Sequence, residues 1–511
     1  MQEEANPPTL DRAAPADRAA HRPRSVSILA GILLLAGCLE MLFLGEQSFN
    51  LDEAYRVILA RLEWPAFWWF LCHREANMSL YCFLLRIWLG VGDSEALIRA
   101  LSVIPALATV PAVYVLGKRL FGLRLGLIGA FLLACNAFHV HYAQDARGYS
   151  LLVFLVVLSS LFFLKGIEQP SGRNWIVYIL TSVLALYTHF FAALVLAAHA
   201  VSLLGLPRRL IPWRKLVLST LLIGFLALPL LFFIFTRDVG QIAWLSRPGV
   251  RDIPRFFSAL AGGGGNLLLA AYLLSCLLAF VKAGKLGFGS GPHFDAWHFQ
   301  FVVAWLFVPV ILALGISLAK PVFLDRYLIV CLPPFVLLAA LGISQIQRRW
   351  VLGVALAVIA ILALRGDYFN YERMGRYQRF DVENWRDATR FLLSEAKPRD
   401  AVLFYHAYGV LPFEYYRSRF QGSTEKPEVV FRPGRALLSD VNIGPIPDAG
   451  FVENLPAHYD RVWLVLYPDN DIVARTPLRL SLAAHYHLVD ARRFPGVGIL
   501  LFRKPAGHEG Q

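Results

Sequence analysis

The chain has 511 residues, of which 57% are hydrophobic and 17% are charged, and its mean hydropathy is +0.53. Soluble domains are nearer half apolar and a quarter charged, so this composition argues against a soluble protein and predicts a polytopic membrane protein. The net charge of +13 is not accompanied by a basic stripe interleaved with aromatic residues. We therefore expect no nucleic-acid partner.

The chain begins with a segment, residues 1–25, that is rich in Ala, Pro and Arg, a composition typical of a disordered tail. An apolar run follows at residues 26–45. It is long for a signal-peptide core and lacks a clear small-residue cleavage site, so we expect an uncleaved first span. The arginines that precede it predict a cytoplasmic N-terminus.

Ten further apolar runs follow, and with the first they predict about eleven transmembrane helices. Lys and Arg occur in every loop that this count places in the cytoplasm, as the positive-inside rule requires. We therefore expect a multi-pass protein of the cell (inner) membrane, with a transmembrane domain at residues 26–364 and an extracytoplasmic C-terminus. The ten runs lie at residues 97–117, 123–138, 149–165, 175–189, 190–206, 216–235, 266–282, 297–318, 327–344 and 351–364.

The first outer loop, residues 46–95, has a pattern of its own. Asp52–Arg61 predicts a short helix, Trp64–Phe70 is an aromatic cluster, and Leu80–Leu89 is amphipathic. These features are typical of helices that lie in the membrane interface, with aromatic rings among the lipid headgroups. They either anchor the loop among membrane lipids or contact a lipid substrate, and the sequence leaves both roles open.

From residue 365 onward charges and prolines become frequent and apolar runs shorten. This change predicts an extracytoplasmic, periplasmic α/β domain at residues 365–511. No glycine-rich phosphate-binding motif follows its strands, so we assign it no catalysis. The predicted elements are helices at Glu383–Glu395 and Gly409–Arg419 and strands at Ala401–Tyr405, Val429–Phe431, Arg461–Tyr467 and Gly498–Phe502.

Asp52 and Glu53 are adjacent acids directly after the first span, and they are the first candidate catalytic residues. Charge beside a bilayer is costly and usually serves a cavity or a partner. A carboxylate there can accept a proton from an attacking hydroxyl or help to hold a divalent cation. The structural alternative is helix capping by Asn50 or Asp52.

Asp145 and Arg147 form the second candidate, and Tyr142 and Tyr149 flank them. The predicted topology places this turn on the same side of the membrane as Asp52. Asp145 is a further candidate acid, and the guanidinium fork of Arg147 suits a phosphate because it binds two oxygens at once. The alternative is that the two charged residues pair with each other or with neighbours.

Four further residues are candidates for substrate binding: Glu75, His189, Arg326 and Tyr327. Each has a structural alternative. Arg326 is either a second phosphate ligand or an interfacial anchor, and Glu75 is either a further acid or a solvated loop charge. His189, a lone histidine at the end of a span, is more often a hydrogen-bonded core residue than a ligand.

Acids and arginines at one face of a membrane protein predict transfer of a group from a lipid phosphate. The arginines would stabilise the leaving phosphate, with or without a divalent cation, which the sequence leaves open. A carboxylate would deprotonate the acceptor hydroxyl. The sequence has no P-loop or nucleotide fingerprint, which is consistent with a donor anchored in the membrane.

The order of these motifs over about residues 26–365 resembles the GT-C superfamily of polytopic membrane glycosyltransferases. Within it the chain is similar to glycosyltransferase family 39 and the bacterial RgtA/B/C/D-like domain, relatives of which are the protein O-mannosyltransferases and lipid A aminoarabinose transferases. The motifs are Phe49–Ala54, Leu80–Trp88, Gly92–Glu95, Leu97–Ser102, Gly117–Gly122, Tyr142–Arg147 and Arg326–Leu328.

The resemblance implies an α-helical GT-C fold and a polyprenyl-phosphate sugar as donor. It implies inverting transfer of a hexosyl or pentosyl group, mannosyltransferase-like, to a lipid, glycan or protein hydroxyl on the outer side. Asp52 matches the acid of the first outer loop, expected to be the general base, and Asp145 and Arg147 match the second-loop motif. Glu75 lies where relatives carry an acid ahead of a Pro-Pro-Leu-Tyr-like segment, but here Ala76–Tyr81 lacks the prolines, so the loop shape and the acceptor are open.

A transporter or flippase of lipid-linked sugars is the competing interpretation, because it too needs charged residues within a membrane domain. Transporters often show internal repeats and helices broken near the midplane. The sequence shows no repeat, and its candidate charges lie at the outer ends of spans. The pattern therefore favours an enzyme.

Overall fold

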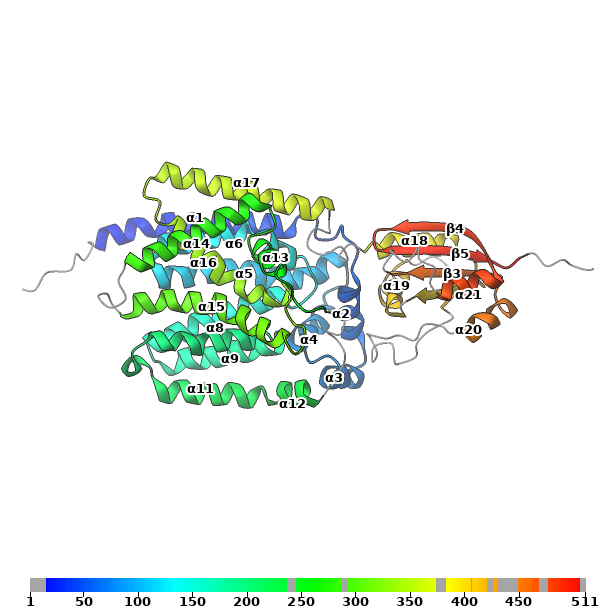
Figure 1. Cartoon of the computed structure of the whole chain (residues 1–511), viewed down its shortest axis with the longest axis horizontal. Helices are drawn as coiled ribbons and strands as arrows, with labels where there is room; N and C mark the ends of the chain where they lie inside the picture. Colours follow the sequence, from blue (N-terminus) through cyan, green and yellow to red (C-terminus); the bar gives the residue numbers. More distant parts are fainter. Residues whose placement is uncertain are drawn as a thin grey trace, which may run out of the picture.

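The computed structural model describes residues 15–236, 245–285, 293–373, 383–405, 407–420, 427–429, 449–467 and 477–505. A bundle of long helices makes up most of the chain, and a small α/β domain lies at one end of it (Figure 1). Helices α2, α3 and α4 occupy the end of the bundle that faces this domain. The fold thus has the predicted order, a helical part followed by a mixed domain.

A helix lies at each predicted apolar run. Helix α1 begins at Pro15, well before the predicted boundary at residue 26, so residues 15–25 are helical and not a disordered tail; residues 1–14 lie outside the described part. The bundle helices are α1 (Pro15–Met41), α5 (Glu95–Phe121), α6 (Leu123–Ala134), α7 (Ala137–Ala143), α8 (Tyr149–Glu168), α9 (Gly172–Thr188), α10 (Ala192–Ser202), α11 (Trp213–Leu226), α12 (Leu228–Thr236), α14 (Asn266–Lys285), α15 (His293–Ser317), α16 (Leu332–Ile343) and α17 (Arg349–Arg373).

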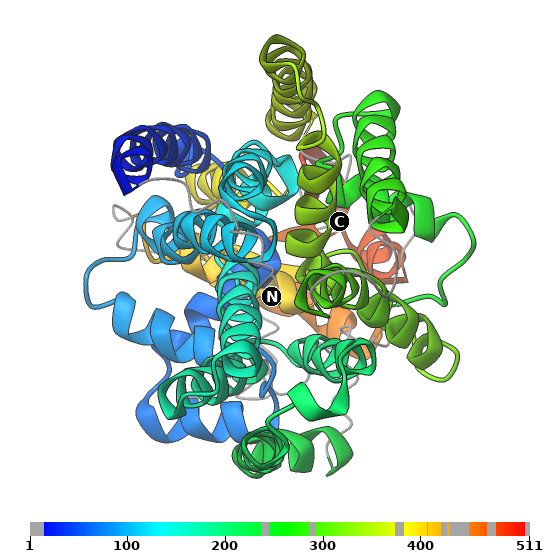
Figure 2. The same cartoon turned by 90° about the vertical axis from the view of Figure 1, so that its left-hand side faces the viewer.

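Within the described residues five helices are long and apolar enough to cross a membrane, or seven if each of two bent pairs is one span. Other apolar helices are shorter, so the count of about eleven spans stays a prediction. Buried residues make up 72% of the apolar window of α8, against 17% in α1 and 22% in α17. A view along the bundle shows α1 and α17 at its periphery (Figure 2).

The bend between α6 and α7 brings the second candidate turn to the α2 end of the bundle. The two helices meet at 61° across Cys135 and Asn136. Asn136 begins α7 as its N-cap, because its side-chain oxygen accepts hydrogen bonds from the amides of Phe138 and His139, both at 3.1 Å. Helix α7 then ends at Ala143, directly before the turn that carries Asp145 and Arg147.

Short helices cover the end of the bundle. The predicted outer-loop helices are present, as α2 (Leu51–Arg61), the aromatic α3 (Trp64–His73) and the amphipathic α4 (Ser79–Trp88). Three tryptophans of α3, Trp64, Trp68 and Trp69, remain about half exposed, as expected of side chains at lipid headgroup level. Helix α13 (Asp252–Leu260) was not predicted.

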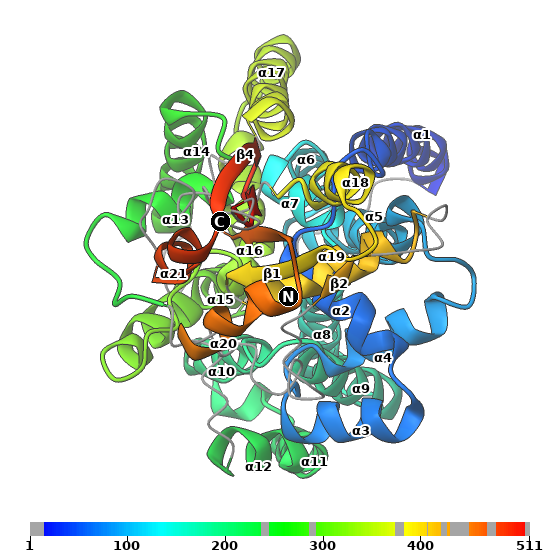
Figure 3. The ribbon, with the colours of Figure 1, turned by 90° about the vertical axis from the view of Figure 1, so that its right-hand side faces the viewer.

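The C-terminal domain contains a five-stranded sheet with the order β2-β1-β3-β5-β4. Strand β1 is parallel to β2 and β3, whereas β5 is antiparallel to β3 and β4. Seen from the domain side, α19, β1 and β2 lie in front of α2 (Figure 3). The elements are α18 (Trp385–Glu395), β1 (Ala401–Tyr405), α19 (Val410–Arg417), β2 (Glu428–Val429), α20 (Ala449–Asn454), β3 (Arg461–Leu466), α21 (Pro477–His485), β4 (His487–Phe494) and β5 (Val497–Arg503).

The predicted strands correspond to β1, β2, β3 and β5, and residues 430 and 431 of the second lie outside the described part. Strand β4 was not predicted. Most of its residues are exposed, so it lacks the apolar alternation by which a half-buried strand is recognised. Helix α17 continues to Arg373, past the predicted domain boundary at residue 365.

Candidate active site

The first turn of α2 carries the acidic pair. Asn50 is the N-cap: its side-chain oxygen accepts from the Glu53 amide at 2.9 Å, while the Glu53 carboxylate accepts from the Asn50 amide at 3.2 Å. This capping box fixes the start of the helix. Two carboxylates at a helix N-terminus are also favoured by the helix dipole. The capping alternative is therefore realised by Asn50 and Glu53, and Asp52 takes no part in it.

Asp52 instead points to the second turn. Its Oδ2 lies 2.6 Å from Nη1 of Arg147, and the Asp52 side chain is 47% exposed whereas that of Arg147 is 9% exposed. Burial would raise the pKa of Asp52, but the positive charges of Arg147, Arg326 and Arg56 outweigh it and hold the pKa below its usual value. At neutral pH the carboxylate is ionised and able to accept a proton.

Glu53 lies behind Asp52 and is fully buried. Its carboxylate accepts two hydrogen bonds from Arg99, from Nε to Oε1 and from Nη2 to Oε2, both at 2.8 Å. Oε1 also accepts from the Ala146 amide at 3.0 Å. Glu53 therefore joins α2 to the turn before Arg147, and these contacts occupy both of its oxygens. This arrangement favours a positioning role over the catalytic role expected from the sequence.

Arg99 of α5 was not among the predicted site residues. Beyond its ion pair with Glu53 it donates to the carbonyl oxygens of Leu44, Gln47 and Ser48 at 2.9–3.2 Å. It thus holds the segment that leads into α2. The signal that could have indicated it is an arginine near the start of a long apolar helix, where charge is costly without a partner.

Side chains of α4 and α5 support the turn that carries Arg147. Tyr81 of α4 and Ser102 of α5 share a hydrogen bond of 2.8 Å, and the Ser102 hydroxyl donates to the Arg147 carbonyl at 3.2 Å. Gly148 packs tightly here, since a Cβ would lie 3.2 Å from side-chain carbons of both Tyr81 and Thr188. The turn is therefore a rigid support for the Arg147 guanidinium, which lies 4.9 Å from the Tyr149 ring centroid.

A polar cavity, partly open to solvent, connects these elements. Its walls come from the segment before α2, from α2 itself, from the turn after α7 and from the residue before Tyr327. Arg147 and Arg326 bring two guanidinium groups to the same space as the ionised Asp52. The predicted site residues that line the cavity are Asp52, Glu53, Tyr142, Asp145, Arg147 and Arg326.

Glu75 is not among the residues that line the cavity. Its Oε1 lies 2.9 Å from Nη1 of Arg56, and its Oε2 accepts from the Tyr55 hydroxyl at 3.3 Å. Arg56 is one helical turn after Asp52 on α2, and its charge helps to keep Asp52 ionised. Glu75 is therefore buried in an ion pair with Arg56 and is not a solvated loop charge.

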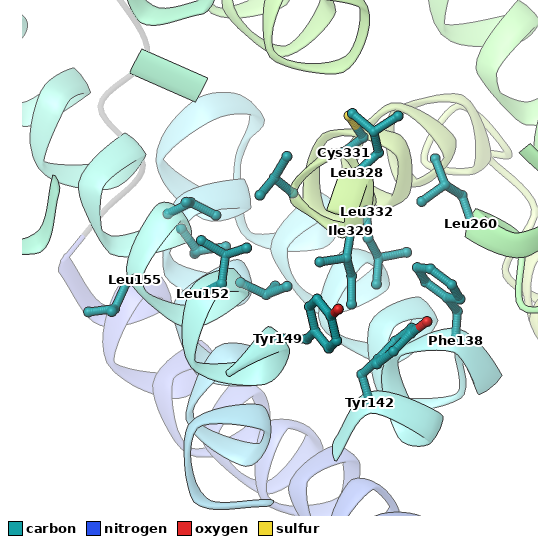
Figure 4. Packing of buried hydrophobic residues seen from close by; sticks show 14 of the residues in the cluster. Phe138, Tyr142, Tyr149, Leu152, Leu155, Leu260, Leu328, Ile329, Cys331 and Leu332 are labelled. Carbon is teal, nitrogen blue, oxygen red and sulfur yellow. The ribbon is translucent and has the colours of Figure 1, made fainter. Parts of the chain in front are cut away.

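His189, Tyr149 and Tyr327 form an aromatic layer behind the cavity. The His189 ring lies 5.2 Å from Tyr327 and 5.9 Å from Tyr149. Its Nδ1 accepts from the Phe191 amide at 3.2 Å, which leaves the ring proton on Nε2. Tyr142 and Tyr149 meet edge to face, with ring centroids 4.9 Å apart, and they extend from α7 and α8 toward the segment that carries Ile329 (Figure 4). Of these rings, Tyr142 lines the cavity, whereas Tyr149, His189 and Tyr327 lie behind it.

This architecture is also found in solved structures. ArnT from Cupriavidus metallidurans bound to undecaprenyl phosphate superposes with a TM-score of 0.63 at 13% identity, covering 93% of this chain and 97% of that chain. The archaeal oligosaccharyltransferase AglB from Archaeoglobus fulgidus, in complex with an inhibitory peptide and a dolichol-phosphate, gives 0.51 at 12% identity, covering 94% and 74%.

The chain has the GT-C fold. A family model described as dolichyl-phosphate-mannose-protein mannosyltransferase also matches residues 79–233. No curated protein matches the chain significantly in sequence. The resemblance to the GT-C superfamily is thereby confirmed, and it reaches into the C-terminal domain, because the ArnT superposition covers nearly the whole chain.

Two cavity carboxylates that a divalent cation could use are engaged by guanidinium groups. Within the described residues no group of three or more His, Cys, Asp or Glu side chains could hold a metal ion. Asp52 is paired with Arg147, and Glu53 with Arg99. Hard cations need several free oxygen ligands. The guanidinium groups of Arg147 and Arg326 bring positive charge to this site.

A second hollow of the GT-C chain is apolar. It lies between α3, α4, α9 and α12, with Trp68, Leu80, Phe83, Leu184 and Phe233 among its walls. On the next position of α4, Tyr81 faces the opposite way, into the hydrogen bond with Ser102 that supports Arg147. Helix α4 therefore lies between an apolar groove and the support of the polar site.

Proposed function

We propose that the chain is an integral membrane glycosyltransferase that moves a sugar from a polyprenyl phosphate to a hydroxyl group on the outer side of the membrane. The observation that carries this proposal is the pairing of Asp52 with Arg147 in a cavity that Arg326 also lines. The cavity offers a base for an acceptor hydroxyl and cations for a phosphate. The acceptor is a lipid, a glycan or a protein.

The donor assignment draws on the solved relatives. ArnT was determined with undecaprenyl phosphate and AglB with a dolichol-phosphate, both of which are polyprenyl phosphates. An apolar groove beside α4 is suited to an isoprenoid chain, because burial of hydrocarbon is favourable at about 25 cal/mol per Å². The phosphate would then lie where Arg147 and Arg326 can bind its oxygens.

Asp52 and the guanidinium groups account for the proton and the charge that move in the proposed reaction. The acceptor oxygen attacks the anomeric carbon, the bond from that carbon to the phosphate oxygen breaks, and the phosphate leaves with an additional negative charge. Asp52 accepts the proton of the acceptor hydroxyl, and the guanidinium groups stabilise the charge that develops on the phosphate. Binding of the phosphate by Arg147 would also release the Asp52 oxygen from its ion pair at the moment it is needed.

The decisive experiment measures sugar transfer from defined polyprenyl-phosphate sugars by purified protein, wild type against Asp52→Asn. We expect the variant to fold and to lose at least about 100-fold in rate, the scale for loss of a proton-transfer group. Asp490→Asn, on the exposed strand β4, is the matched control and keeps the wild-type rate. Equal rates for wild type and Asp52→Asn would remove Asp52 from the mechanism. Movement of lipid-linked sugar across liposomes without any transfer would support a flippase instead.

A further inference from the structure

The segment that leads into α2 is held from two sides. Arg99 binds it from the helical bundle, and Arg386 of α18 binds it from the C-terminal domain. Arg386 donates to the carbonyl oxygens of Gly45, Glu46 and Gln47 at 2.9–3.0 Å. The two guanidinium groups therefore donate hydrogen bonds to neighbouring carbonyl oxygens of one short segment. The C-terminal domain thus helps to hold the segment before α2 in place.

A second contact ties the same segment to the domain. Tyr416 of α19 accepts a hydrogen bond from the buried Phe49 amide at 2.7 Å and donates to the carboxylate of Glu95 at 2.8 Å. Glu95 also binds Arg386 at 2.7 Å. A buried amide without a partner is costly. The backbone at Phe49 therefore has its native conformation only while the domain is in place.

The third contact reaches the helix that carries the base. Glu383 is buried, and its Oε2 accepts hydrogen bonds from the Leu51 amide at 2.8 Å and from Nε1 of Trp385 at 2.6 Å. Oε1 lies 2.6 Å from the hydroxyl of Tyr467. Leu51 is the first residue of α2 and directly precedes Asp52. A carboxyl group of the C-terminal domain thus satisfies a first-turn amide that the helix itself leaves without a partner.

We infer that Glu383 is a positioning residue of the active site. Through Glu383 the C-terminal domain fixes the position of Asp52. The inference rests on the proposed function for its catalytic meaning. Its structural content, that Glu383 holds the first turn of α2, can be measured without any activity.

Glu383 should make the stability of the protein depend on pH, which a neutral hydrogen-bonding group would not do. Burial raises the pKa of Glu383 to about 8 against the three hydrogen bonds that lower it, and the charge of Asp52 adds to the rise. Tyr467, Trp385, the Leu51 amide and Asp52 are the groups that act on it. Either form fits the site, because the neutral carboxyl can donate to Tyr467 through Oε1 while Oε2 still accepts from Leu51.

The sign of the pH effect follows from linkage. Glu383 binds its proton more tightly in the folded protein than at its ordinary pKa of 4.5. The contribution of Glu383 to stability is therefore greatest below pH 4.5 and falls as pH rises to about 8, where the folded form also ionises. Glu383→Gln keeps the acceptor for Leu51 and cannot ionise, so its unfolding temperature should fall less over this interval.

The test compares Glu383→Gln and Glu383→Ala with wild type in the full chain. We expect Glu383→Gln to keep the transfer rate within about threefold and Glu383→Ala to lose at least about tenfold in kcat with little change in the donor KM, because misplacement of a catalytic group lowers rate more than binding. Amide hydrogen exchange at Leu51 and Asp52 should be faster in Glu383→Ala alone. Glu428→Gln is the matched control, since Glu428 also binds a tyrosine hydroxyl, Tyr459 at 2.7 Å, but on exposed β2.

The outcomes separate the two hypotheses. Wild-type exchange and wild-type kcat in Glu383→Ala would overturn the positioning role. If the wild type transfers no sugar, the proposed function fails, while the exchange data still decide whether Glu383 holds α2. Should Glu383→Ala not fold, Glu383→Gln still provides a test, and an unfolding temperature that depends on pH in the same way as that of wild type would count against the inference.

Discussion

Oδ2 of Asp52 lies 2.6 Å from Nη1 of Arg147, although 95 residues separate them in the chain. The contact joins the first turn of α2 to the turn after α7. Each turn has a further contact: Arg99 binds Glu53 in the first turn of α2, and Ser102 donates to the Arg147 carbonyl in the second. A phosphate that enters the cavity competes with a carboxylate for the same guanidinium.

Replacement of Arg147 should change both the rate and its pH dependence. Asp52 must be ionised to accept a proton, and Arg147 is the strongest of the charges that lower its pKa. Arg147→Gln should therefore move the acidic limb of kcat to higher pH. Arg147→Lys keeps the charge and the limb but loses the bidentate fork, so we expect a loss of about tenfold or more in rate. The pH profile of kcat for both variants measures this, and an unshifted limb in Arg147→Gln would contradict it.

Loss of Arg99 should destabilise the whole protein. Arg99→Ala leaves the buried Glu53 carboxylate without its cation, and breaking a buried pair in this way costs about 3–5 kcal/mol. The exposed pair of Arg255 and Asp252 is the control, and Arg255→Ala should cost less than about 1 kcal/mol. Thermal unfolding in detergent compares the two. Similar losses for both variants would show that the Glu53 pair carries no special share of stability.

Removal of one hydroxyl should loosen the segment before α2. Tyr416→Phe leaves the buried Phe49 amide without its acceptor, at a cost of about 1–3 kcal/mol. Hydrogen exchange at Phe49 should accelerate accordingly. Tyr459→Phe removes an exposed hydroxyl of the same domain and should leave that exchange unchanged. Equal protection at Phe49 in both variants would be the contrary result.

Chelation should not affect transfer. Asp52 and Glu53, two of the cavity carboxylates, are paired with guanidinium groups, and no group of three or more potential metal ligands is found among the described residues. EDTA is therefore expected to leave the rate at its initial value, and added Mg²⁺ or Mn²⁺ to leave it unchanged. A rate that falls with EDTA and returns with a divalent cation would show that a metal, and not Arg147 with Arg326, neutralises the phosphate.

The meeting of Asp52 and Arg147 could be foreseen from the sequence for a physical reason. Charged residues at the outer ends of apolar spans are costly, and the topology placed both on one side of the membrane. The helices at 51–61 and 79–88 could be foreseen too, because their amphipathic patterns are local.

The contacts that hold the site in place could not be predicted from the sequence in the same way. Glu383 reaches Leu51 across 332 residues, and Arg386 reaches Gly45 across 341, so no local pattern records either contact. Glu53 was expected beside Asp52 as a catalytic acid because adjacent carboxylates look alike in sequence. The structure distinguishes them, because Glu53 is buried in its ion pair with Arg99 whereas Asp52 is about half exposed beside Arg147.

Because Arg99 and Arg386 bind the same segment, the C-terminal domain cannot be exchanged freely for that of a related protein. A chimera that grafts a different C-terminal domain onto the helical bundle would lose the donors to Gly45, Glu46 and Gln47 unless the graft brought an arginine to the same place. The two parts can therefore be exchanged among homologues only as a matched pair, and a mismatched fusion should insert in the membrane yet carry a disordered entrance to α2.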